Sequence, residues 1–154
     1  MDAIDRILVE RLKADGRIAW TELGQAVGIS GVAVAERIHK LERGGIIQGF
    51  TVLLSPEALG KELTAFIAVT VESPEACAPF LEAVQRMDQV LECHHVAGED
   101  SYLLKVRTGG TRELEGLISG GLKRLPGVSK TRTTIVLSTA KESVHPPLPA
   151  VEEP

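Results

Sequence analysis

The segment from Ser30 to Arg43 has polar side chains that could bind nucleic acid if they share one face of a helix. Val34, Ile38 and Leu41 recur at the three- and four-residue interval of a helix with one apolar face. A rotation of about 100° per residue, starting from Val34, turns the other side of this helix to solvent. The outward-facing residues are Val32, Glu36, His39, Lys40 and Arg43. This face is the candidate surface for reading a DNA groove, and an ordinary solvated helix face is the alternative.

Charge alone does not separate these two interpretations, because Arg37, Lys40 and Arg43 share the helix with two glutamates. The segment before the helix favours the functional one. Gly28 can end a preceding short helix, and Ser30 can cap the first amides of the next. Two short helices joined by a glycine-containing turn form the pattern of a helix-turn-helix.

A second group of chemically capable residues, Cys93, His94 and His95, invites a metal assignment. Neighbours on a strand point to opposite faces, and no second ligand pair stands at zinc-site spacing. No nucleophile, base and orienting group form a recognisable arrangement, and no phosphate-binding glycine loop is present. We therefore expect no metal, no cofactor and no enzymatic activity.

Composition suggests two small domains in 154 residues, of which 44% are hydrophobic. The formal net charge is −4, and residues 1–45 carry equal numbers of cations and acids. Such a neutral DNA-binding unit should bind DNA weakly as a monomer. Two copies that bind together would double the contacts with DNA and raise the affinity. Two cysteines make no disulfide framework, and neither a signal peptide nor an 18-residue apolar span is evident. We expect a cytoplasmic protein with no membrane segment.

The first predicted domain covers residues 1–54. Asp2 can cap a first helix that ends at Gly16, and the two helices of the helix-turn-helix follow. The apolar run IIQGFTVLL then predicts a strand that turns at Gly49, as in a winged helix-turn-helix. Residues 55–63 contain a proline and a glycine and are predicted to be a linker with at most one short helical turn.

The second predicted domain covers residues 64–140 and has the element order β-α-β-β-α-β. This order is typical of a ferredoxin-like α+β fold, in which both helices pack on one face of a four-stranded sheet. The predicted strands are 64–71, 89–98, 101–108 and 128–139, and the predicted helices are 74–87 and 111–125. Residues 141–154 contain HPPLP and are expected to be a disordered tail, with a proline-recognition ligand as the alternative.

The first of these strands is apolar on both faces, because Phe66 and Ala68 alternate with an equally apolar set. That set is Ala65, Ile67, Val69 and Val71. Two helices cover only one face of the sheet, which predicts that the other is buried against a second subunit. The alternative is a monomer whose central strand is simply apolar on both sides.

Several segments, taken in order and at their spacing, resemble the Lrp/AsnC (feast/famine) family of prokaryotic transcriptional regulators. The resemblance extends from Asp2 to about Thr139. It rests on DAIDRILVERLKADGR, on the pair Glu22 and Leu23, and on GIS, VAERIHKLERGGII, VAGEDSYLLKVR and LPGVSKTRTTIVL. Each segment is a weak match alone, but their shared order makes the resemblance strong.

The resemblance implies a fold, partners and site residues. In that family a winged helix-turn-helix binds double-stranded DNA, and a ferredoxin-like RAM domain joins homodimers into octamers or similar rings and senses amino acids. It places the second helix of the motif in the major groove. Residues near bases would be Ser30, Gly31, Val32, Ala35, Glu36 and His39, and those toward phosphates Arg37, Lys40 and Arg43.

The chain departs from the family pattern at two positions. Ala19 stands where the family commonly has a capping Ser or Thr, so Thr21 could begin the helix instead. Ser101 replaces an acid in the loop that the family often writes G-D-x-D-Y, and Glu99 or Asp100 would have to supply the charge. The implied effector site lies between dimers and combines Gly98, Glu99, Asp100, Ser101 and Tyr102 with Thr133, Thr134 or Ser138. An ordinary hairpin turn is the alternative for this loop.

The sequence thus predicts a DNA-binding, nucleoid-associated transcriptional regulator whose assembly and DNA occupancy respond to an amino acid or related effector. Two alternatives stay open. One is an architectural DNA-binding protein without an effector, and the other is a small-molecule sensor subunit of a metabolic enzyme.

Overall fold

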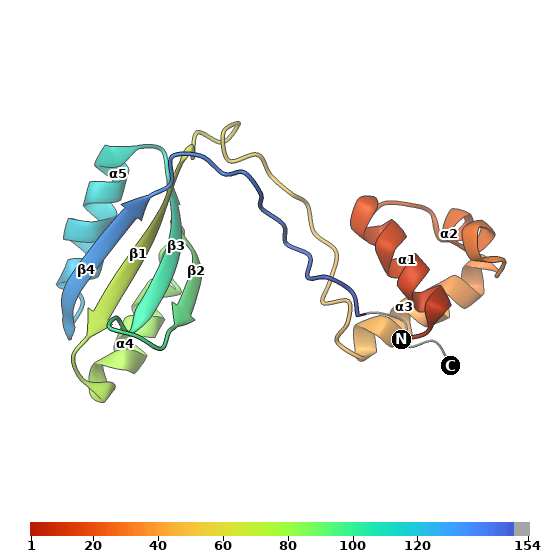
Figure 1. The fold of residues 1–154 in the computed structure, drawn as a ribbon, viewed down its shortest axis with the longest axis horizontal. Coiled ribbons are helices and arrows are strands. Elements are labelled where there is room, and N and C mark those ends of the chain that lie inside the picture. The colour runs from red at the N-terminus through yellow and green to blue at the C-terminus, as the bar shows by residue number, and fades with distance from the viewer. Residues whose placement is uncertain (150–154) are drawn as a thin grey trace. The chain divides into compact units, whose positions relative to one another are not determined.

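A computed structural model describes residues 1–149 and divides the chain into two compact units (Figure 1). The first unit comprises Met1–Leu53 together with the stretch that begins at Lys141, and the second is Leu54–Ala140. Each unit buries its own apolar cluster. Each unit is therefore described by itself.

The first unit contains three helices, α1 (Ala3–Ala14), α2 (Trp20–Val27) and α3 (Gly31–Arg43). Their core consists of four fully buried side chains, Leu8, Leu23, Val34 and Ile38. Val34 and Ile38 belong to the predicted apolar stripe of the second motif helix, so the helical period of the sequence correctly identifies the inward face of α3.

The turn between α2 and α3 has the expected chemistry. Gly28 ends α2 in the left-handed region at φ 72°, and the hydroxyl oxygen of Ser30 accepts a bond of 3.2 Å from Ala33 N. Gly24 permits a close approach, because a Cβ atom there would lie 2.4 Å from the carbonyl oxygen of Ile29. The predicted helix-turn-helix is confirmed.

Helix α2 begins at Trp20, one residue before the alternative start at Thr21, and its N-cap Ala19 makes no side-chain capping bond. Glu22 stands at the third position of the helix, where it could complete a capping box with a hydroxyl residue at the cap. We expect Ala19→Ser to stabilise the first unit by about 1 kcal/mol. Urea unfolding followed by the fluorescence of Trp20, the single tryptophan, measures this change. An unchanged urea midpoint would show that the missing capping bond does not limit the stability of the first unit.

The strand predicted after α3 is not formed. Residues 46–54 have no helix or strand, and Phe50, Val52 and Leu53 are exposed. A strand needs a second strand to pair its backbone groups, and the described part of the first unit contains none. The single chain therefore has the helix-turn-helix without its wing.

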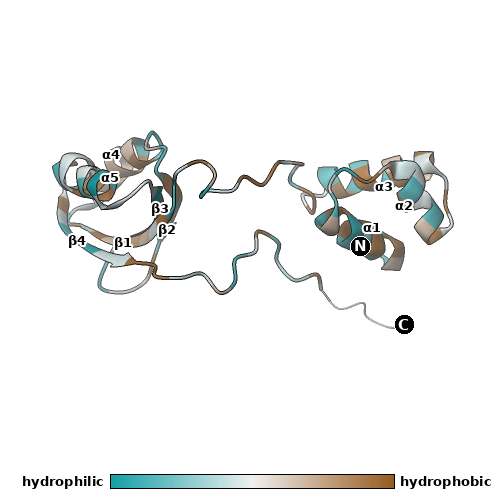
Figure 2. Cartoon of the chain, turned by 90° about the horizontal axis from the view of Figure 1, so that it is seen from above, coloured by the Kyte–Doolittle hydropathy of each residue, from teal (hydrophilic) through white to brown (hydrophobic). Residues whose placement is uncertain are grey.

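The second unit has the predicted βαββαβ order. Its strands are β1 (Leu63–Val71), β2 (Val90–His95), β3 (Tyr102–Thr108) and β4 (Val128–Ile135). They form one antiparallel sheet in the order β2-β3-β1-β4. Helices α4 (Pro74–Val84) and α5 (Thr111–Glu115) lie on the same side of this sheet (Figure 2). The ferredoxin-like α+β fold is confirmed.

The second predicted helix is less regular than expected. It is α-helical only at Thr111–Glu115 and continues as a π-helical segment, Gly116–Gly121, and a short 3₁₀ turn, Leu122–Arg124. Three glycines in the middle segment provide no side-chain packing and weaken a regular helix.

The two faces of β1 are both apolar, as predicted, and they differ in burial. Ala65, Ile67 and Val69 are fully buried under the helices, next to Phe80 of α4. The opposite face, here called the open face, carries Phe66, Ala68 and Leu103 along its centre. Phe66 is still 36% exposed, so this face has an apolar centre that the single chain does not cover.

Residues 55–61 form a well-defined turn rather than a loose linker. Ser55 Oγ accepts a 3.1 Å bond from Ala58 N, and Lys61 N donates a 2.7 Å bond to the Pro56 carbonyl. The turn packs closely on the second unit, because a Cβ atom on Gly109 would lie 2.8 Å from the Gly60 carbonyl oxygen. The ion pair between Lys61 and Glu113 fixes it further.

The stretch after β4 has no helix or strand as far as residue 149, and the rest of the predicted 141–154 tail lies outside the described residues. Among residues 1–149, no helix is both long and apolar enough to cross a membrane.

Candidate nucleic-acid interface and effector site

Helix α3 presents the predicted face to solvent. Val32 is 71% exposed, although it is an aliphatic residue in a helix. The exposed residues at and along α3 include Ser30, Val32, Glu36, His39, Lys40 and Arg43, whereas Gly31, Ala35 and Arg37 are half-buried. An exposed apolar residue beside cations suits a groove, where it can contact thymine methyl groups.

Trp20, which the sequence pattern did not single out, extends this surface. Its indole lies edge-on to the His39 imidazole with ring centroids 5.7 Å apart. Trp20 is 40% exposed at the first position of α2, so it supports His39 from the neighbouring helix. An exposed tryptophan beside a recognition helix is itself a signal that sequence reasoning could have used.

Arg37 has a different environment from the one that the resemblance implies. Its guanidinium donates two 2.7 Å bonds, one to Asp2 Oδ2 and one to Asp5 Oδ1. The same two acids form the capping box at the start of α1, and Asp5 is buried. The bond from the Asp5 backbone and the one from Arg37 lower the pKa of Asp2, and the two acids raise the pKa of Arg37. The arrangement ties α3 to the first turn of α1.

Lys40 and Arg43 are the two cations of α3 that remain available for phosphates. Both lie in its last turn, and neither has an ion pair within the described part of the chain. They are therefore better placed than Arg37 to neutralise DNA.

Arg37→Ala and Lys40→Ala should consequently have different effects. Loss of Arg37 leaves the buried Asp5 carboxylate without its cation, so we expect a lower melting temperature for the first unit and weaker DNA binding with an unchanged salt slope. Loss of Lys40 should leave melting unchanged and reduce the slope of log K against log[salt] by about 1. Trp20 fluorescence and DNA titrations at several salt concentrations measure both. A reduced slope at normal stability in Arg37→Ala would instead indicate a phosphate contact.

The loop between β2 and β3 is held against the sheet by Asp100. This carboxylate is buried, accepts a 2.6 Å bond from the Arg132 guanidinium and a 3.1 Å bond from Thr70 Oγ1. Glu99 is exposed, with its carboxylate 4.0 Å from Arg132. Arg132 of β4 is a residue that sequence reasoning missed.

Ser101 replaces the second acid of the family pattern and has a structural role. Its Oγ accepts a 3.0 Å bond from Val71 N and donates one of 3.3 Å to the Val71 carbonyl. Its own amide donates to Val69 O at 2.9 Å. The serine thus fastens the loop to the end of β1.

The single chain does not bring all the predicted effector residues together. Thr133 pairs with Ile67 and faces the helices, whereas Thr134 pairs with Phe66 on the open face. Ser138 follows β4 beyond the start of β1, at the opposite end of the sheet from the loop. Tyr102 is buried against Phe80, with ring centroids 4.9 Å apart.

Cys93, His94 and His95 end strand β2. Burial raises the pKa of the Cys93 thiol. The His94 imidazole pairs across from Leu103 on the open face and lies 3.1 Å from a Glu92 carboxylate oxygen. Within residues 1–149, no three His, Cys, Asp or Glu side chains gather closely enough to hold a metal ion.

The chain combines an exposed helix-turn-helix with a ferredoxin-like domain, in which hydrogen bonds of Asp100 and Ser101 hold the loop between β2 and β3. This combination is that of a class of two-part DNA-binding regulators. Two family models match the chain: an AsnC-type helix-turn-helix domain at residues 1–42 and an Lrp/AsnC ligand binding domain at residues 64–146. The chain belongs to the Lrp/AsnC family of transcriptional regulators, whose members are not enzymes.

Curated relatives support this assignment over nearly the whole length. The leucine-responsive regulatory proteins of Klebsiella pneumoniae and Escherichia coli K12 are each 41% identical over 145 residues, which is 93% of this chain and 88% of theirs.

Solved structures agree. A Neisseria meningitidis transcriptional regulator in complex with L-Met has a TM-score of 0.91 at 28% identity, covering 96% of both chains. A feast or famine regulatory protein of M. tuberculosis complexed with L-methionine has a TM-score of 0.84 at 39% identity, covering 94% of this chain and 97% of that one.

Proposed function

We propose that this regulator binds DNA as a homodimer or larger assembly and that an amino acid changes its occupancy. The observation that carries the proposal is the pairing of a charge-neutral DNA-binding unit with a sheet whose open face has an apolar centre. A neutral unit has little attraction for phosphates, so repetition of the unit must supply affinity.

In the proposed complex α3 enters the major groove. Val32 and His39 lie near the bases, with Ser30, Gly31, Ala35 and Glu36 close to them. Lys40 and Arg43 contact phosphates, and Arg37 positions the helix through α1. Few of these side chains can read a base by two hydrogen bonds, so DNA shape contributes to the choice of site.

Assembly is proposed to begin at the open face. Phe66, Ala68 and Leu103 would be buried against the same residues of a second copy. The exposed apolar segment 46–54 supports pairing as well, because a second copy would supply the strand that it lacks. Dimers would then associate further into an octamer or similar ring.

The proposed effector site is the loop Gly98–Tyr102, completed by Thr133, Thr134 or Ser138 of another subunit. The complexes of two structural neighbours with methionine support an amino acid as the ligand. Here Asp100 already holds Arg132, so an effector's ammonium group would use Glu99 or share Asp100, and its carboxylate would approach Arg132.

Selection of bound genomic fragments by the purified chain, with and without a mixture of amino acids, tests the proposal. We expect specific fragments to be enriched and their occupancy to change with the mixture, because an effector must bind two states differently to shift them. Enrichment that the mixture leaves unchanged would favour an architectural protein without an effector. No enrichment at all would contradict the DNA-binding role. We further propose that the protein works in the cytoplasm, where the genomic DNA of a bacterium is found.

A further inference from the structure

Trp20 and His39 form an aromatic pair on the surface of the first unit, where both residues are exposed. Their rings lie at 87° to each other with centroids 5.7 Å apart, which is the edge-to-face arrangement that aromatic pairs prefer. Trp20 is the first residue of α2, and His39 lies in the second half of α3. The pair therefore joins the outer surfaces of the two helices of the helix-turn-helix.

The core of the first unit does not include this pair. Neither ring belongs to the buried cluster or to the partly buried hydrophobic side chains that pack against it. The indole is 40% exposed, so much of its surface faces solvent next to the recognition helix. What the indole contacts there is a polar side chain of that helix, and the contact is thus a feature of the surface.

Trp20 restricts the orientation of the His39 imidazole. Within residues 1–149 this imidazole takes part in no hydrogen bond or ion pair, although Glu36 stands one turn before it and Arg43 one turn after it. An exposed histidine without such a contact samples several rotamers, and fixing one of them on DNA costs free energy. A ring already packed against the indole loses less freedom when it binds.

His39 lies on the face of α3 that enters the groove in the proposed complex. It follows Val32 by seven residues, which is two helical turns or about 10 Å along the helix axis. The major groove is about 12 Å wide, so side chains two turns apart on one face can both reach base edges. The first helix of such a motif crosses the DNA backbone, which brings Trp20 to the rim of the same groove.

We propose that Trp20 and His39 act together as one base-reading unit with a preference for guanine. An imidazole N–H donates a hydrogen bond, and guanine is the base that shows two acceptors and neither a donor nor a methyl group in the major groove. His39 contacts the base, and Trp20 is a positioning residue. Glu36 only accepts hydrogen bonds and suits the amino group of cytosine, the base paired with guanine. The inference rests on the proposed placement of α3 on DNA.

Selection from a library of random duplexes by the full chain, followed by sequencing, tests this unit. The wild type should select a guanine that His39→Ala selects about tenfold less strongly, because one hydrogen bond to a base is lost. Trp20→Leu keeps an apolar side chain without a ring and should weaken the preference at the same position by about fivefold. Trp20→Phe keeps a ring and should restore most of it. The double variant Trp20→Leu/His39→Ala should be no worse than His39→Ala alone, because the two residues act as a unit.

A matched control and two further measurements separate base reading from a general loss of binding. Gln25→Ala changes another exposed residue of α2 and should select the wild-type sequence. Far-ultraviolet circular dichroism checks folding, because the single tryptophan is itself replaced in some variants. The slope of log K against log[salt] should match that of the wild type in every variant, since neither residue contacts a phosphate.

Three results would overturn the inference while the proposed function stands, because the wild type would still select a sequence. The first is an unchanged base preference in His39→Ala, or a base other than guanine at the affected position. The second is a preference lost in His39→Ala but kept in Trp20→Leu. The third is a Trp20→Leu protein that binds all duplexes more weakly with the same preference, which is the result of a purely structural role. A wild type that selects no sequence would contradict the proposed function, and the inference with it.

Discussion

Gly24→Ala should unfold the first unit while the second unit stays folded. An added Cβ would lie 2.4 Å from the Ile29 carbonyl oxygen and 3.3 Å from the Ser30 carbonyl carbon, both rigid backbone atoms. Relief requires the turn between α2 and α3 to open, which separates the helices that Leu23 and Val34 hold together. Overpacking of this kind costs about 3 kcal/mol, which is comparable with the whole free energy of unfolding of a unit of about fifty residues.

The two single aromatic residues make this experiment selective. Trp20 is the only tryptophan and lies in the first unit, and Tyr102 is the only tyrosine and lies in the second. We expect Gly24→Ala to shift the Trp20 emission to that of the unfolded chain, to abolish DNA binding and to leave the Tyr102 signal unchanged. Gly16→Ala is the matched control, because its Cβ would meet only the Leu12 carbonyl oxygen at 3.8 Å. A Gly24→Ala protein as stable as the wild type would show that the turn between α2 and α3 can widen to accept the added methyl group.

Phe66→Glu should separate the proposed assembly into monomers. Phe66 is at the centre of the open face, between Lys105 on β3 and Thr134 on β4, and nothing in the single chain covers it fully. A carboxylate buried there in a subunit interface would lose its water, and the neighbouring Lys105 is already paired with Glu92 at 3.2 Å. DNA affinity should fall by about a hundredfold, because each neutral DNA-binding unit would then bind alone.

Sedimentation and a DNA titration measure these two effects together. Ala78→Glu is the control, since it adds the same charge at an exposed position of α4, on the helical side of the unit. We expect it to sediment and bind DNA as the wild type does. If Phe66→Glu sedimented as the wild type at normal stability, the open face would not be the interface.

Local patterns predicted the elements whose structure depends on near neighbours. The apolar stripe of α3, the Gly28 that ends α2 and the Ser30 cap all follow from residues within about one helical turn. The alternation of β1 predicted two apolar faces, but it did not say which of them the helices cover; the structure shows that it is the side of Ile67 and Val69. The prediction of a strand at 46–54 was wrong because the same unit supplies no second strand to pair with it. A local pattern does not tell whether such a second strand is present.

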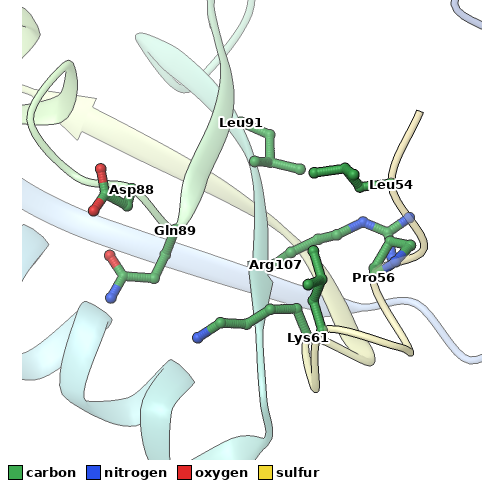
Figure 3. Close-up of a pocket in the computed structure, with 8 residues that line it drawn as sticks. Leu54, Pro56, Lys61, Asp88, Gln89, Leu91 and Arg107 are labelled. Carbon is green, nitrogen blue, oxygen red and sulfur yellow. The ribbon is translucent and has the colours of Figure 1, made fainter. Parts of the chain in front are cut away.

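The site residues show the same division. Periodicity correctly predicted that Lys40 and Arg43 face solvent. It could not identify the partners of Arg37, because the two acids that bind it lie 35 and 32 positions earlier in the chain. Arg132 was missed for an equivalent reason, because it reaches Asp100 from a strand 32 residues later. The pocket between the turn at Leu54–Lys61 and the residues Asp88–Leu91 (Figure 3) was likewise not predicted, because its two walls come from segments that meet only in the folded unit.

The central claim, that α3 binds the DNA backbone through Lys40 and Arg43, is tested most directly by the salt dependence of binding to a duplex of selected sequence. The double variant Lys40→Ala/Arg43→Ala should bind more weakly and reduce the slope of log K against log[salt] by about two for each protomer. Its melting should match that of the wild type, because neither side chain is buried. A slope equal to that of the wild type would contradict the placement of α3 on DNA.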